Sequence, residues 1–238
     1  MTRAQNAGLP ADAGLPTGTD KERTVRAMFD RIAPRYDALN RAMTFGLDTG
    51  WRRRTVASLQ LPPSALVLDV ACGTGDFCRE LVRTGLVAVG IDSSWGMLVA
   101  GRRVAPLVQA DALALPVRSG AVAGVTCGFA LRNVVELPRL FDEFARALRP
   151  GGRVALLEVA EPTSPLVRAG HRMYFRRVVP FVGGLFSDRT AYRYLPKSTA
   201  YLPPLADLLT LLGAAGFAEV RSTPLGLGAV RITTGTRR

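Results

Sequence analysis

From residue 66 onward, short apolar runs alternate with segments in which apolar residues recur every three to four positions. The first pattern is typical of buried strands and the second of amphipathic helices. Strands are predicted near 66–71, 87–91, 107–110, 122–128 and 153–159, and helices near 75–84, 94–104 and 136–148. Because strands and helices alternate, we expect an α/β fold with a mostly parallel sheet and helices on both faces.

The segments that flank this alternation predict further helices and a terminal hairpin. Helices are expected from Asp20 to Ile32 and near 49–59, 165–179 and 204–215, with final strands near 219–224 and 229–235. Residues 1–18 repeat Ala-Gly-Leu-Pro among small and polar residues, which is typical of a flexible tail. No repeat of domain size is present, so we expect residues 19–238 to form a single domain.

The charge balance narrows the classes of partner. Lys and Arg number 31 against 19 Asp and Glu, a formal net charge of +12, which favours either nucleic acid or acidic phospholipid. The chain has none of the interleaved aromatic and basic motifs typical of RNA-binding modules, so no nucleic-acid partner is expected. Apolar runs are too short to span a membrane or to form a secretory signal, and the cysteines lack metal-ligand spacing. These features predict a cytoplasmic protein without a metal site.

Candidate chemistry begins where the first predicted strand ends. Residues 67–76 read Val-Leu-Asp-Val-Ala-Cys-Gly-Thr-Gly-Asp, which places Asp69, Gly73, Thr74 and Gly75 in or beside a glycine-rich turn. Such a turn allows bare backbone to approach a ligand closely. The pattern is not G-x-G-x-x-G, because Cys78 stands at the third glycine position, and no P-loop is present. A dinucleotide site is therefore not expected.

Further special residues follow the next strands. Asp92 ends the second strand, where an acid can accept hydrogen bonds from both hydroxyls of a ribose. Asp111 and Ala112 follow the third strand, where a carboxylate can accept from an adenine amine, and Gly128 follows the fourth. Ligands of open parallel sheets bind beyond the carboxyl ends of the strands, so we expect a site for an adenosine-containing small molecule. Taken alone, Asp92 could be a helix cap and Asp111 a turn residue.

Several segments resemble those of a known enzyme family. The glycine-rich turn resembles motif I of S-adenosylmethionine-dependent methyltransferases. Tyr36-Asp-Ala-Leu-Asn40, Phe129-Ala-Leu-Arg-Asn133 and residues 146–158 resemble signatures of the ubiquinone/menaquinone biosynthesis C-methyltransferase family, and the likeness spans roughly residues 21–236. It implies the class I methyltransferase fold, a Rossmann-like, seven-stranded sheet with N-terminal helices over the pocket, and S-adenosylmethionine as the cofactor.

The resemblance also implies a reaction, the C-methylation of a demethylated prenyl-quinol such as demethylmenaquinol. Arg132 would stabilise the phenolate, since a ring hydroxyl titrates near ~10 in water and a fixed cation favours its ionised form. Asn133 would hold a second ring oxygen, and Asp37 or Asp76 would take the proton. Tyr36 is a further candidate catalytic residue, with a core aromatic as the alternative. Three alternatives remain open: methylation of another aromatic small molecule, an RNA-directed protein, and cofactor binding without catalysis.

Some positions depart from the family's usual pattern. Asp48 and Thr233 stand where the family usually has His, and Gly128 and Ala160 where it has Ser, so ring type and prenyl length stay open. Arg168, Arg172, Arg176 and Arg177 form a basic face opposite apolar residues near 165–179. This pattern predicts peripheral contact with an anionic membrane, with a solvated arginine stripe above a buried face as the alternative. A homodimer is also left open.

Overall fold

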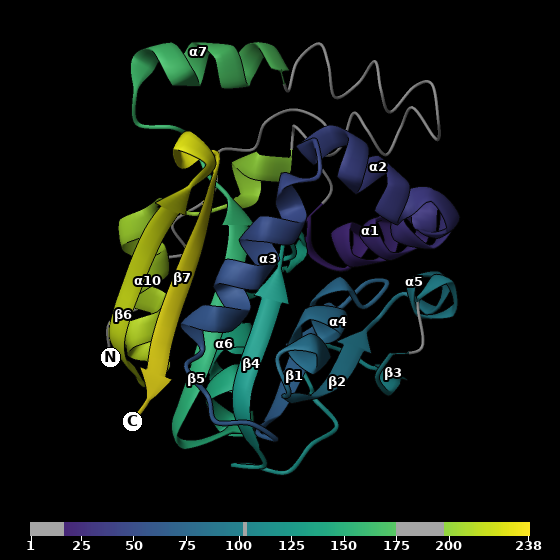
Figure 1. The fold of residues 1–238 in the computed structure, drawn as a ribbon, viewed down its shortest axis with the longest axis vertical. Helices are drawn as coiled ribbons and strands as arrows, with labels where there is room; N and C mark the ends of the chain where they lie inside the picture. The colour runs from purple at the N-terminus through teal and green to yellow at the C-terminus, as the bar shows by residue number, and fades with distance from the viewer. Residues whose placement is uncertain (1–16, 102–103, 175–197) are drawn as a thin grey trace.

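The computed structural model describes residues 17–101, 104–174 and 198–238. Seven strands form one sheet in the order β3-β2-β1-β4-β5-β7-β6 (Figure 1). The strands are β1 Leu66–Val70, β2 Val87–Asp92, β3 Leu107–Gln109, β4 Val122–Gly128, β5 Leu148–Val159, β6 Phe217–Leu225 and β7 Val230–Arg237. β1 to β5 pair in parallel, whereas β7 runs antiparallel between β5 and β6. The predicted seven-stranded, mostly parallel sheet and its terminal hairpin are confirmed.

Helices cover both faces of this sheet. They are α1 Gly18–Ile32, α2 Tyr36–Thr44, α3 Leu47–Ser58, α4 Asp76–Arg83, α5 Trp95–Ala100, α6 Leu137–Ala147, α7 Pro165–Met173 and α10 Leu205–Ala214. Short 3-10 turns lie at η1 Ala33–Arg35, η2 Leu131–Asn133, η4 Thr199–Tyr201 and η5 Gly226–Gly228. Figure 1 shows α3 and α4 in front of the sheet, with α6 and α10 behind it.

The two faces of the sheet bury different apolar side chains. Phe141 and Phe144 of α6 are fully buried on one face, and Phe77 and Leu81 of α4 are buried on the other. The central strand β4 is buried along nearly its whole length, as expected for a strand covered on both faces. This double burial fixes the positions of the strand ends, where the special residues lie.

The N-terminal helices differ from the predicted pattern. α1 begins at Gly18, which lies within the expected tail of residues 1–18, and residues 1–16 lie outside the described part of the chain. Asp20 is not the cap but pairs with Arg23 in the first turn. The helix α2, which the sequence did not predict, follows Pro34. Pro34 lies in the first turn of the 3-10 segment η1, where a proline is tolerated, and a new helix can begin after it.

Other boundaries shift by a few residues. α3 begins at Leu47 rather than at residue 49, and α5 ends at Ala100, short of the predicted residue 104. The predicted basic helix near 165–179 is described as α7 only as far as Met173. Arg176 and Arg177 lie outside the described residues, and no described helix has the length and apolar character needed to cross a bilayer.

Specific polar contacts hold α1 over the sheet. Asp30 near its end accepts hydrogen bonds from the Ser94 hydroxyl (2.6 Å) and the Gly96 amide (2.8 Å) at the start of α5. Near its beginning, the buried Lys21 ammonium donates to the Val134 carbonyl (3.0 Å) and lies 3.7 Å from the centre of the Tyr201 ring. Both ends of α1 are therefore fixed against elements of the core.

Candidate active site

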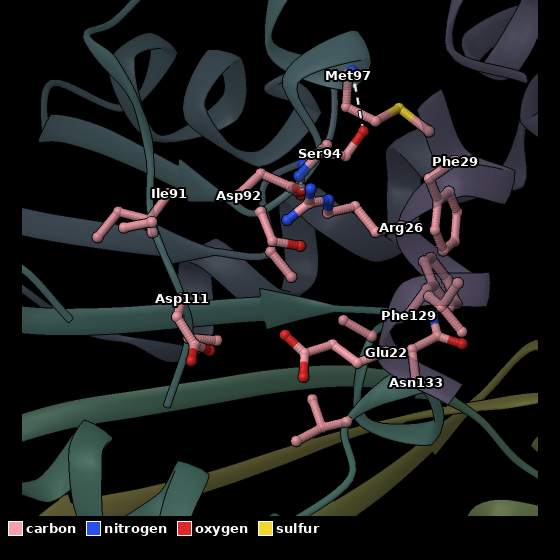
Figure 2. Close-up of a pocket in the computed structure, with 18 of the residues that line it drawn as sticks. Glu22, Arg26, Phe29, Ile91, Asp92, Ser94, Met97, Asp111, Phe129 and Asn133 are labelled. Carbon is pink, nitrogen blue, oxygen red and sulfur yellow. Dashed lines mark hydrogen bonds between the residues drawn. The ribbon is translucent and has the colours of Figure 1, made fainter. Parts of the chain in front are cut away.

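A first cavity lies beyond the carboxyl ends of β1, β2 and β4. Its lining includes Gly73, Asp92, Asp111, Ala112, Gly128 and Asn133 from the sheet side. Glu22, Arg26 and Phe29 extend into it from α1, as Figure 2 shows. α1 therefore closes a cavity that the sheet alone would leave open.

Asp92 connects two loops at the edge of the first cavity. Its carboxylate accepts hydrogen bonds from the Gly73 amide (2.8 Å) and from the Ser94 amide (2.8 Å). Burial raises the pKa of Asp92, while these two amides act in the opposite direction. The acid thus holds the glycine-rich turn against the start of α5 and presents its carboxylate to the cavity.

The glycine-rich turn needs glycine for its backbone conformation. Gly73 has φ +57° and Gly75 has φ +86°, both in the left-handed region. Gly75 caps α4, and the buried Thr74 hydroxyl donates to the Asp37 carboxylate. Thr74 and Gly75 are not among the residues that line the first cavity, so their role is to set the conformation of the turn.

Asp69 lies beneath the turn rather than in the cavity. It is 1% exposed and stands opposite Thr126 in the β1–β4 register, where its carboxylate accepts from the Thr126 hydroxyl (3.0 Å). The Cys78 thiol lies 3.6 Å from its other oxygen. Burial raises the pKa of Asp69 to about 7. The structure therefore gives Asp69 a place in the interior and does not bring it to the cavity.

Two further predicted residues line the first cavity with evident local roles. One oxygen of Asp111 accepts from the Leu113 amide (2.8 Å), which is the turn role expected of an aspartate there. At Gly128, an added Cβ would lie 2.4 Å from the Phe77 ring. The ring therefore fills the space that the family's usual Ser would need.

A second cavity, of about 390 Å³, adjoins the first. Its lining is mainly apolar and includes Met43, Phe45, Leu47, Trp51, Leu227 and Val230. Phe29, Tyr36 and Phe129 line both cavities, and we call these three residues the shared aromatic wall. The arrangement can hold two ligands that meet at this wall.

The second cavity also contains buried charge. Arg132 and Arg52 are each 7% exposed, and they form ion pairs with the buried acids Glu158 and Asp48, respectively. Burial raises the pKa of Tyr36, while the two arginines oppose that shift. Each guanidinium has five N–H donors, so one that is paired with an acid still has donors for a ligand anion, and the apolar walls reduce the screening of that interaction.

The structure brings only some of the predicted catalytic residues together. Arg132 and Tyr36 line the second cavity, whereas Asn133 lines the first. Asp37 is bonded to Thr74, and Asp76 forms an ion pair with Arg79 at 2.9 Å. Neither acid is among the residues that line either cavity.

Sequence reasoning missed Arg52, Glu22, Arg26 and Asp30. Arg52 follows Asp48 by four residues, a spacing that pairs charges on one helix face, and it could have been found from that signal.

Thr233 and Ala160, which also depart from the family's usual pattern, have local contacts in the structure. Thr233 is buried in β7 with its hydroxyl 3.4 Å from that of Ser222, and the amide of Ala160 donates to the Ala229 carbonyl.

Comparison with known proteins identifies the family. Residues 17–237 match the ubiE/COQ5 methyltransferase family. A demethylmenaquinone methyltransferase of Roseiflexus castenholzii is 44% identical over 234 residues, covering 94% of this chain and 98% of that protein. The ubiquinone/menaquinone biosynthesis C-methyltransferase UbiE of Syntrophotalea carbinolica is 40% identical over 221 residues, covering 89% and 93%.

A solved structure shows the same fold at low identity. A SAM-dependent methyltransferase of Thermotoga maritima aligns with a TM-score of 0.63 at 19% identity, covering 89% of this chain and 99% of that chain. The resemblance expected from the sequence is thus confirmed. The chain belongs to the ubiE/COQ5 methyltransferase family and is a methyltransferase with the class I fold.

Proposed function

We propose that the protein transfers a methyl group from S-adenosylmethionine to a ring carbon of a demethylated prenyl-quinol, with demethylmenaquinol as the first candidate. The observation that carries this proposal is the apolar second cavity, which is lined by the buried Arg132 and by the shared aromatic wall. The names of the two relatives support the same reaction. The substrate ring belongs in the second cavity and the cofactor in the first.

The first cavity suits the cofactor at several points. Asp92 would accept from the ribose hydroxyls, and Asp111 and Ala112 would contact the adenine. Gly73 lines the cavity without a side chain, so the methionine half could pass close to its backbone. When bound, the cofactor supplies an electrophilic methyl group.

The second cavity suits an electron-rich ring. A ring carbon becomes nucleophilic when the neighbouring hydroxyl loses its proton to solvent, and the Arg132 guanidinium favours that ionised form. As the new bond between the ring carbon and the methyl group forms, the bond between sulfur and the methyl group breaks, and the ring carbon then loses its own proton to restore the aromatic ring. Glu158 pairs with Arg132 from the interior and fixes its orientation. The apolar walls exclude water, which strengthens the interaction between the guanidinium and the developing oxyanion.

A direct assay tests the proposed reaction. Purified enzyme would be given methyl-labelled S-adenosylmethionine with a panel of demethylated quinols, simple phenols and RNA under anaerobic conditions. We expect label in the quinol, at a ring carbon. Label in a simple phenol or RNA, with none in any quinol, would contradict the proposal.

The assignment of Asp92 is tested separately by cofactor binding. Asp92→Ala removes charge-assisted hydrogen bonds worth about 1.5–3 kcal/mol each. Calorimetric titration with S-adenosylhomocysteine should therefore show at least a tenfold loss of affinity, about 1.4 kcal/mol. The affinity of Asp92→Asn, which keeps one acceptor, should lie between those of wild type and Asp92→Ala. Equal affinities for all three proteins would exclude this role.

We also propose that the open end of the second cavity contacts an anionic membrane, where a prenylated substrate resides. Phe45, Leu47 and Leu227 line the cavity and are 77%, 55% and 82% exposed, which places apolar side chains at its mouth. α7 lies at the same end in Figure 1, and Tyr174 just after it donates to the Met43 carbonyl. These apolar residues support membrane contact more directly than Arg168, whose guanidinium is bonded to the carbonyls of residues 162 and 163.

A further inference from the structure

Arg52 is a buried cation in the second cavity whose role the proposed reaction leaves open. Its guanidinium lies 5.8 Å from the centre of the Phe129 ring and 5.9 Å from that of Phe77. It forms an ion pair with Asp48 and lies 3.5 Å from a carboxylate oxygen of Asp76. The group therefore lies close to two acids and to two aromatic rings.

The burial of Arg52 and Asp48 adds little net stability, which favours a functional role for the pair. Moving an arginine and an aspartate out of water carries a desolvation penalty that their attraction often only balances. Asp48 is 1% exposed and is the only acid among the described residues that line the second cavity. Its other oxygen lies 3.0 Å from the Thr44 hydroxyl, which also lies 2.7 Å from the Asn40 carbonyl.

Arg52 and Arg132 resemble each other in their surroundings. Each is buried, each forms an ion pair with a buried acid, and both lie close enough to Tyr36 to oppose the rise that burial causes in its pKa. They are the only cationic side chains among the described residues that line this cavity. A cavity with two fixed cations and otherwise apolar walls matches a flat, apolar ring that carries two oxygens.

We propose that Arg52 binds the second oxygen of the substrate ring and thereby selects a quinol over a ring with a single hydroxyl. This inference rests on the proposed function and deepens it. It assigns to Arg52 the role that the sequence suggested for Asn133, which the structure places in the other cavity. Asp48 is then a positioning residue that orients Arg52, which gives a physical meaning to the departure from His at this position.

The test compares two probes that differ by one hydroxyl, 1,4-dihydroxynaphthalene and 1-naphthol. Arg52→Gln removes the charge and the forked donor geometry, so the preference for the diol should fall by tenfold to a hundredfold. Methylation of each probe gives kcat/KM, and binding to the cofactor-free protein gives a second readout. Trp51 lines the cavity, so quenching of its fluorescence in a Trp95→Phe background reports binding directly.

Matched variants separate a specific role from a structural one. Arg53→Gln removes an exposed arginine from the same helix and should keep the preference, because Arg53 pairs with Glu80 outside the cavity. Arg52→Lys and Asp48→Asn should each keep part of it. If Arg52→Gln fails to fold, the comparison rests on these two variants, and an unchanged preference in both would overturn the proposal.

The outcomes also separate this inference from the proposed reaction. Equal losses for both probes in Arg52→Gln, or no loss for either, would overturn the role of Arg52. If the wild-type protein methylates neither probe nor any prenyl-quinol, the proposed reaction fails. Tighter binding of the diol that depends on Arg52 would still support the inference in that case.

Discussion

Arg132 differs from the exposed arginines of this chain, because its guanidinium is buried and faces an apolar cavity. If it stabilises the phenolate mainly in the transition state, Arg132→Ala should lower kcat by about a hundredfold or more and change cofactor affinity little. Arg132→Lys should recover only part of the rate, because the forked geometry is lost. Steady-state kinetics on the quinol, with calorimetry on S-adenosylhomocysteine, measures both quantities. An unchanged kcat in the Ala variant would refute the role.

Asp69 makes stability depend on pH in an unusual direction. Its pKa is about 7 in the folded protein, above the ordinary value of 3.8, so between these values the folded state binds more protons than the unfolded state. The contribution of Asp69 to stability is therefore full below pH 4 and is lost as the pH rises through 7. The Asn side chain of Asp69→Asn cannot ionise. The free energy of unfolding of this variant minus that of wild type should therefore increase between pH 5 and pH 8.5, by on the order of 2–4 kcal/mol.

Denaturant unfolding of both proteins at several pH values measures this difference. Comparing the two proteins at each pH cancels the titration of all other groups. A difference that stays constant over the whole range would show that Asp69 does not titrate there.

At the scale of elements, the contacts of α1 decide whether the first cavity is closed. Asp30→Ala removes both hydrogen bonds to the start of α5, while the apolar contacts of Met28 and Ile32 remain. We expect the variant to fold, with about tenfold weaker binding of S-adenosylhomocysteine by calorimetry. Asp20→Ala, which removes an exposed acid from the same helix, should bind as wild type does. Equal affinities for wild type and Asp30→Ala would show that these two hydrogen bonds do not contribute to the cofactor site.

The sequence predicts β1, β2 and β4 because each is a largely apolar run with a clear end. It fails at α2, since the helix begins two residues after a proline that normally signals a stop. It also places Asp69 at the ligand, because position in the chain shows that an acid is near a strand end but not which way its side chain points. Arg52 escapes notice for a similar reason, since an arginine on a helix usually faces solvent.

At the scale of the whole molecule, apolar side chains at one end lie on a protein of strong positive charge. Flotation with vesicles should show binding that increases with anionic lipid and weakens with salt. Phe45 and Leu227 have left-handed backbones (φ 51° and 58°), so Asn is the suitable replacement at both positions. The double variant should float at least tenfold less, because each apolar side chain contributes about 1.5–3 kcal/mol.

A control variant on another element makes this comparison specific. Val99→Asn replaces an exposed apolar residue of α5, which is 66% exposed, and should float as wild type does. Flotation of the double variant at the wild-type level would move any membrane contact away from the mouth of the second cavity.

The shared aromatic wall means that the two cavities cannot be filled independently. We expect a ligand in either cavity to restrict the motion of Phe29, Tyr36 and Phe129, so that the second ligand incurs less of that entropy loss. We therefore predict that each ligand increases the affinity for the other. By reciprocity, the factor by which one ligand tightens the other is the same in both directions. At concentrations that leave each binary complex sparsely populated, the enzyme would accumulate the ternary complex, the only species in which methyl transfer occurs.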